Sequence, residues 1–217
     1  MIYVKRLNFC FIRVPKNASS SVMHYMYHNV CDPTVDMISH GITTYPDRVS
    51  FINCPRLEHS HVDVKFVIDE LKVPKSSRFV GVIRHPLEKQ LSLYLFRIRE
   101  GVYKVPPSKE HFNSLLIDGE LSDHRYWQRQ HQHTFLEYDN ECIGEWWLYE
   151  NLTHHLNTFM NEYGLEEKIP LQNFNVSPGS KPSLIDVFYT ATSRAQAEKA
   201  FEKDLELYEK VKRQCNL

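Results

Sequence analysis

The sequence predicts an α/β fold with a central, mostly parallel sheet flanked by helices. The apolar runs at residues 8–14 and 78–84 contain aromatic and β-branched side chains, which is typical of buried strands. A helical pattern follows each run, and this alternation of strand and helix indicates a parallel sheet. The chain has 217 residues, which suits one ordinary domain, so we predict a single domain over residues 1–217.

The other elements follow from their patterns in chain order. After a polar turn, apolar residues at helical spacing predict a helix at residues 19–30. Pro86 opens the helix after the second strand, because a missing N–H is harmless at a helix start. The remaining patterns predict strands at 49–52 and 141–147, and helices at 64–71, 109–117, 151–163 and 194–213.

Composition excludes several classes of protein. The net charge is -1 and the pI is about 6.9, so no overall basic field indicates a nucleic-acid partner. The five cysteines contain no C-x-x-C pair, which argues against a disulfide framework or a zinc ribbon. Charged and polar residues interrupt residues 1–11, so we expect no signal peptide, and no run is long enough for a membrane span. We therefore expect a cytoplasmic protein.

The first candidate site is the segment 12–22, Ile-Arg-Val-Pro-Lys-Asn-Ala-Ser-Ser-Ser-Val, which reads as strand, polar loop and helix start. The N–H groups and the dipole of a helix start favour an anion, and Lys16 adds a positive charge. The segment lacks both glycines of a Walker A loop. It is a candidate phosphate or phosphosulfate site; the alternative is that its serines only cap the helix.

The second candidate site follows the strand at residues 78–84. Arg84 stands at the carboxyl end of this strand, where open α/β sheets bind ligands, and Ser92 lies in the following helix. An arginine fork suits a phosphate with two exposed oxygens. The alternative is an arginine that only ties down the helix start through backbone carbonyls.

Together the two segments resemble the donor sites of sulfotransferases, particularly the carbohydrate branch that includes the heparan sulfate 2-O-sulfotransferases. The resemblance implies a P-loop nucleotide-binding-like sulfotransferase fold. It also implies transfer of a sulfuryl group from 3′-phosphoadenosine-5′-phosphosulfate (PAPS) to a hydroxyl acceptor. Arg84 and Ser92 would bind the 3′-phosphate of PAPS. The residues that would bind its 5′-phosphosulfate form one loop: Lys16, Asn17, Ala18, Ser19, Ser20 and Ser21. Weaker similarity continues at residues 124–130, 143–145, 149–152, 173–177 and 204–208.

The candidate base comes from residues 59–61, His-Ser-His, which resemble the H-G-H stretch of the 2-O-sulfotransferases. The second histidine of that stretch is the general base, so the resemblance points to His61. An imidazole with an ordinary pKa of roughly 6.5 can accept a hydroxyl proton at neutral pH. His59 is a candidate for the same role or for orienting the acceptor. Lys16 would neutralise charge on the bridging oxygen of the leaving nucleotide.

Two alternative functions stay open. A small kinase-like enzyme is disfavoured, because the Walker glycines and a Mg²⁺-carboxylate signature are missing. A catalytically inactive nucleotide-binding module is suggested by His85, where the family usually has aspartate. We expect no metal, although His131 and His133 have a ligand-like spacing. The expected partner is a glycan or another small molecule with a hydroxyl group, and the sequence does not indicate the oligomeric state. Aromatic residues such as Trp146 and Trp147 could line an acceptor cleft or belong to the core.

Overall fold

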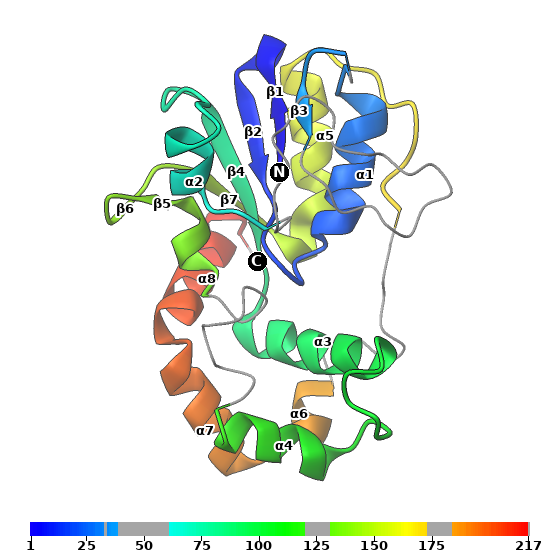
Figure 1. Cartoon of the computed structure of the whole chain (residues 1–217), viewed down its shortest axis with the longest axis vertical. Helices are drawn as coiled ribbons and strands as arrows, with labels where there is room; N and C mark the ends of the chain where they lie inside the picture. Colours follow the sequence, from blue (N-terminus) through cyan, green and yellow to red (C-terminus); the bar gives the residue numbers. More distant parts are fainter. Residues whose placement is uncertain (33, 39–60, 120–130, 173–183, 217) are drawn as a thin grey trace. The chain divides into compact units, whose positions relative to one another are not determined.

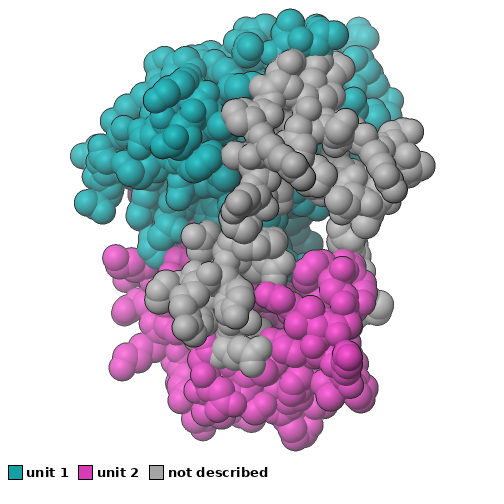
Figure 2. All heavy atoms as spheres, in the orientation of Figure 1, with its two compact units in different colours: residues 1–83, 133–174 teal, residues 84–132, 175–217 magenta. Residues whose placement is uncertain are grey.

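The computed structural model describes residues 1–32, 34–38, 61–119, 131–172 and 184–216 (Figure 1). The chain divides into two compact units (Figure 2). Unit 1 comprises residues 1–83 and 133–174, and unit 2 comprises residues 84–132 and 175–217. Unit 1 holds a sheet with helices, and the described part of unit 2 is helical. The predicted mixed α/β class with a mostly parallel sheet is therefore confirmed.

A five-stranded sheet with the strand order β3-β1-β2-β4-β7 forms the centre of unit 1. Its strands are β1 (Ile2–Val4), β2 (Phe9–Ile12), β3 (Met37–Ile38), β4 (Arg78–Ile83) and β7 (Glu145–Leu148). The strands β2, β4 and β7 run parallel, whereas β1 runs antiparallel to β2 and β3. Ile12 pairs with Gly81, so β2 and β4 end at the same edge of the sheet. A separate two-stranded sheet joins β5 (Glu137–Tyr138) to β6 (Glu141–Cys142).

The helices α1 and α5 cover one face of this sheet (Figure 1). The helical segments of unit 1 are η1 (Lys5–Leu7), α1 (Ser19–Asn29), α2 (Val64–Asp69), η3 (His133–Leu136), η4 (Tyr149–Asn151) and α5 (Leu152–Glu162). Phe9 of β2 packs against Phe159 of α5, with 4.6 Å between the ring centroids. Close packing also explains Gly81, because a Cβ there would lie 2.9 Å from the ring of Trp146. The buried parallel strands thus form a rigid base for the loops that follow them.

Unit 2 packs its helices around an apolar cluster of its own. Its helices are α3 (Pro86–Arg99), α4 (Lys109–Ile117), α6 (Leu184–Phe188), α7 (Ala191–Ala200) and α8 (Glu202–Gln214). Leu87 and Tyr94 of α3 meet Phe112 of α4 and Tyr189 in this cluster. The buried amide of Asn113 donates to the Phe188 carbonyl at 2.7 Å and thereby joins α4 to the end of α6.

Most predicted elements are found, with some differences in their bounds. The helix predicted at 109–117 is α4, whereas the helix predicted at 194–213 is α7 and α8, separated at the buried Phe201. The strand predicted at 141–147 is interrupted at Gly144, where a Cβ would lie 2.8 Å from the Phe79 carbonyl. The strand predicted at 49–52 lies outside the described residues. No helix in the described ranges has the length and apolarity that crossing a bilayer requires.

Candidate functional site

The loop between β2 and α1 leaves the sheet at the edge where β2 and β4 end. Lys16 (φ 64°) and Ala18 (φ 55°) both adopt the left-handed backbone conformation, which costs a non-glycine residue about 1–2 kcal/mol. Asn17 lies between them, fully buried, and its Nδ2 donates a 2.6 Å hydrogen bond to the Val82 carbonyl of β4. This bond ties the strained loop to the neighbouring strand, without the glycines of a Walker loop.

The start of α1 has no side-chain cap. Its N-cap residue is Ala18, which makes no capping hydrogen bond. Ser19 and Ser20 instead accept hydrogen bonds from the Arg13 guanidinium, at 3.4 Å from Nε and 3.2 Å from Nη2. Capping is therefore not the role of these two serine side chains. Because N–H groups in the first turn have no acceptor within the helix, this end of α1 presents positive partial charge to the loop.

Arg13 is a candidate site residue that the sequence patterns did not indicate. Its side chain follows β2 and is only 7% exposed. Burial lowers the pKa of Arg13 to about 10, so the guanidinium still carries its charge at neutral pH. The loop thus combines two cations, the buried Arg13 and the partly exposed Lys16. A charged residue at the end of an apolar run was the sequence signal that could have found it.

His61 contacts this same arginine through the backbone. Its Nδ1 lies 2.8 Å from the Arg13 carbonyl oxygen. Because a carbonyl oxygen only accepts, Nδ1 carries the ring proton and Nε2 carries the lone pair. Burial, and then the positive charges of Arg13 and Lys16, hold the pKa of His61 well below its ordinary value. His61 is therefore a neutral imidazole at neutral pH, with Nε2 as its basic nitrogen.

Arg84 follows β4 directly and is the first residue of unit 2. Its Nε pairs with Glu88 Oε2 at 3.1 Å, and the side chains are only 9% and 16% exposed. Glu88 and Ser92 are four residues apart in α3, so they share one face of the helix. The ion pair therefore directs the guanidinium toward the face that carries Ser92.

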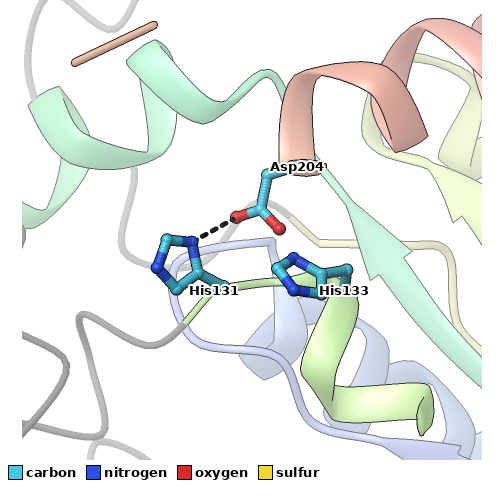
Figure 3. A group of neighbouring side chains, drawn as sticks. All are labelled: His131, His133 and Asp204. Atoms are coloured by element: carbon cyan, nitrogen blue, oxygen red, sulfur yellow. Dashed lines mark ion pairs between the residues drawn. The ribbon is translucent and has the colours of Figure 1, made fainter. Parts of the chain in front are cut away.

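A buried polar network surrounds the backbone of Arg84 in unit 2. The Gln132 side chain accepts from the Arg84 N–H at 3.0 Å and donates to the Arg84 carbonyl at 2.9 Å. Asp204 Oδ2 accepts from the Gln132 N–H at 2.8 Å and lies 3.9 Å from His131 Nδ1 (Figure 3). Burial lowers the pKa of Lys89 to about 8, although the nearby Asp204 charge opposes this shift. Asp204 thus serves hydrogen bonding and charge balance inside unit 2.

The structure brings part of the predicted site together. In unit 1, Ser19, Ser20 and His61 all contact Arg13. Arg84 and Ser92 belong to unit 2. Predicted residues outside the described ranges are His59 and the similar segments at 124–130 and 173–177.

Other predicted features have different outcomes. His85 is the N-cap residue of α3 but makes no capping hydrogen bond, and burial lowers its pKa. Trp146 and Trp147 are 9% and 4% exposed, so they belong to the core rather than to an acceptor cleft. Glu88 was missed, although its position four residues after Arg84 is a recognisable helical pairing signal. Gln132 was also missed, and no local pattern in the sequence indicates it.

The described part of unit 1 combines a cationic loop, an uncapped helix start and a neutral imidazole. Such a combination can bind an anionic group and accept a proton from a nearby hydroxyl. Comparisons with family models, with curated proteins and with solved structures give no match for this chain.

Proposed function

We propose that this chain is a sulfotransferase that moves a sulfuryl group from PAPS to a hydroxyl acceptor. The observation that carries this proposal is the 2.8 Å contact between His61 Nδ1 and the Arg13 carbonyl, across 48 residues of sequence. It joins the histidine predicted as the base to Arg13, which follows β2 and leads into the loop predicted to hold the phosphosulfate. The resemblance on which both predictions depend does not itself involve this contact. We further propose the P-loop nucleotide-binding-like sulfotransferase fold, as one domain over residues 1–217.

The loop at residues 16–21 is proposed to bind the 5′-phosphosulfate of PAPS. Backbone N–H groups at the start of α1 would donate to its oxygens, and Lys16 would add a mobile charge. Asn17 would contribute through its backbone, because its side chain is turned toward Val82. The fixed charge of Arg13 supports the same loop through the serine hydroxyls.

Arg84 and Ser92 in unit 2 are proposed to bind the 3′-phosphate. Glu88 contacts Nε of Arg84, so a bidentate contact to a phosphate would use the two Nη atoms. The nearby carboxylate also balances the charge of this largely buried guanidinium. Recognition of the 3′-phosphate is what would distinguish PAPS from ATP.

The proposed reaction is an in-line displacement at sulfur. The acceptor oxygen forms a new bond to sulfur while the bond between sulfur and the bridging phosphate oxygen breaks. Adenosine 3′,5′-bisphosphate (PAP) leaves, and Lys16 stabilises the negative charge that develops on its oxygen. The acceptor proton goes to Nε2 of His61, which becomes an imidazolium. As in phosphoryl transfer, positioning and charge stabilisation are expected to supply most of the catalysis. The acceptor is proposed to be a carbohydrate, on the family resemblance.

Calorimetric titration with PAP and with ATP tests donor recognition. We expect micromolar binding of PAP, weak binding of ATP and loss of PAP binding in Arg84→Ala. Arg99→Ala is the matched control, because Arg99 is an exposed arginine of the same helix, where it pairs with the adjacent Glu100 at 3.3 Å. A folded wild-type protein that does not bind PAP would refute the proposal.

Sulfuryl transfer from labelled PAPS to a panel of glycans and other hydroxyl compounds tests the chemistry. Lys16→Ala and His61→Ala should abolish transfer while the circular dichroism spectrum is retained. Wild-type activity in both variants would remove the assigned roles. Magnesium-dependent transfer from ATP would instead favour a kinase-like enzyme, and PAP binding without any turnover would favour an inactive nucleotide-binding module.

A further inference from the structure

Gln132 pairs with the backbone of Arg84 as a neighbouring strand would. Its side-chain amide accepts from the Arg84 N–H at 3.0 Å and donates to the Arg84 carbonyl at 2.9 Å. Both residues are buried, and Gln132 is fully so. A buried backbone N–H or carbonyl without a partner is costly, so this pair of bonds strongly favours one orientation of the peptide groups on either side of Arg84.

Gln132 is itself held by the C-terminal part of unit 2. Its backbone N–H donates to Asp204 Oδ2 at 2.8 Å, and Asp204, near the start of α8, is fully buried. Lys89 of α3 is also buried and interacts electrostatically with the same carboxylate. Asp204 of α8 thus holds the backbone of Gln132, and Lys89 of α3 balances the charge of Asp204.

The side chain of Arg84 is held at a second point by the Glu88 carboxylate, 3.1 Å from Nε. With its backbone held by Gln132 and its guanidinium by Glu88, Arg84 has little freedom to change its direction. A bidentate contact to a phosphate depends on that direction, because the fork of an arginine is planar and rigid.

We propose that Gln132 is a positioning residue, which aims Arg84 for recognition of the 3′-phosphate of the donor. This inference rests on the proposed function. It assigns the selectivity for a 3′-phosphorylated nucleotide to the Gln132–Arg84 pair rather than to Arg84 alone.

The test replaces Gln132 by methionine, which has a similar volume but cannot make either hydrogen bond to Arg84. Its backbone N–H can still donate to Asp204. The readout is the ratio of the dissociation constants of AMP and PAP, two ligands that differ in the 3′-phosphate. We expect Gln132→Met to lower this ratio about tenfold, the lower end of what one charge-assisted hydrogen bond contributes. The affinity for AMP should hardly change. Arg84→Ala should show the complete loss of discrimination between AMP and PAP.

Asn113→Leu is the matched control, because Asn113 is another buried amide of unit 2 that bonds to backbone groups, at Lys109 and Phe188. It should lower the melting temperature without changing the ratio. An unchanged ratio in Gln132→Met, with strong discrimination in the wild type, would overturn the positioning role alone. A wild type that binds PAP no better than AMP would overturn the donor assignment, and this inference with it. Equal losses of affinity for AMP and for PAP in Gln132→Met would show that Gln132 has a merely structural role.

Discussion

Replacing Asn17 by alanine removes the hydrogen bond that ties the loop at residues 16–21 to β4. The lost 2.6 Å hydrogen bond is buried, and the Val82 carbonyl would be left without this donor. An amide–carbonyl bond contributes about 0.5–1.5 kcal/mol, and a buried group left unpaired costs about 1–3 kcal/mol. We therefore expect the free energy of unfolding to fall by roughly 1–3 kcal/mol, the cost of leaving the buried carbonyl unpaired. At roughly 2–4 °C per kcal/mol for a chain of this size, the melting temperature should fall by roughly 2–12 °C.

The loop should respond more than the rest of unit 1. Lys16 and Ala18 flank Asn17 in left-handed conformations, and without the anchor they can relax to the ordinary regions of backbone space. Relaxation would remove the alignment of the N–H groups, so PAP binding should weaken by about tenfold or more. Urea denaturation measures the first effect and calorimetric titration with PAP measures the second.

Asn29→Ala is the control for this experiment. Asn29 is a buried asparagine at the other end of α1, where it donates to the Ile169 carbonyl at 2.9 Å and accepts from the Lys168 N–H at 2.6 Å. It should destabilise the fold at least as much as Asn17→Ala but leave PAP affinity close to that of the wild type. Normal PAP affinity in Asn17→Ala, or equal losses of affinity in both variants, would refute the reasoning.

Further predictions concern the base, the leaving group and the sheet. Because the pKa of His61 is lowered, kcat/KM should stay constant as the pH falls through about 6.5 and decline only in more acid solution; an acid limb at or above that pH would contradict the neutral, buried base. Between about pH 6.5 and the lowered pKa, His61 is protonated in the unfolded chain but not in the folded chain. The free energy of unfolding should therefore decrease as the pH decreases, by up to about 1.4 kcal/mol for each unit by which folding lowers the pKa. Denaturation at several pH values should show this slope in the wild type and a smaller one in His61→Gln. Lys16→Met should lower the single-turnover rate about 10²–10³-fold, with a smaller effect on PAP affinity; the reverse order of effects would make Lys16 a binding residue only. Gly81→Ala should lower the free energy of unfolding by about 1–3 kcal/mol, because its Cβ would lie 2.9 Å from the Trp146 ring; wild-type stability in urea would show that the ring moves aside freely.

Local patterns predicted the parts of the fold that local forces determine. The strand at residues 78–84 and the helix opened by Pro86 are found as β4 and α3, because an unbroken apolar run and a proline at a helix start have few other solutions. The helix at 109–117 has the predicted bounds, with Ser108 as the N-cap residue accepting from the His111 N–H.

Contacts between distant residues could not be predicted in the same way. β1 is a strand of three residues, Ile2–Val4, that exists because β2 and β3 pair with it on either side. A segment of that length carries too little periodicity to identify. The candidate site shows the same division. The strand–loop–helix patterns indicated Lys16 and Arg84, and the family resemblance indicated His61. The role of Arg13 and the hydrogen bonds between Gln132 and Arg84 depend instead on tertiary contacts across 48 residues.

Arg13 makes its hydrogen bonds through two chemically separate groups, the guanidinium and the backbone carbonyl. Its guanidinium donates to the serine hydroxyls, but the atom that orients His61 is its backbone carbonyl. A substitution at position 13 can change the first group and cannot remove the second. Substitutions at position 13 could therefore change the charge beside the loop while His61 keeps its proton on Nδ1. The two contacts share one residue but can change independently, so a substitution that removes the guanidinium would leave the hydrogen bond to His61 in place.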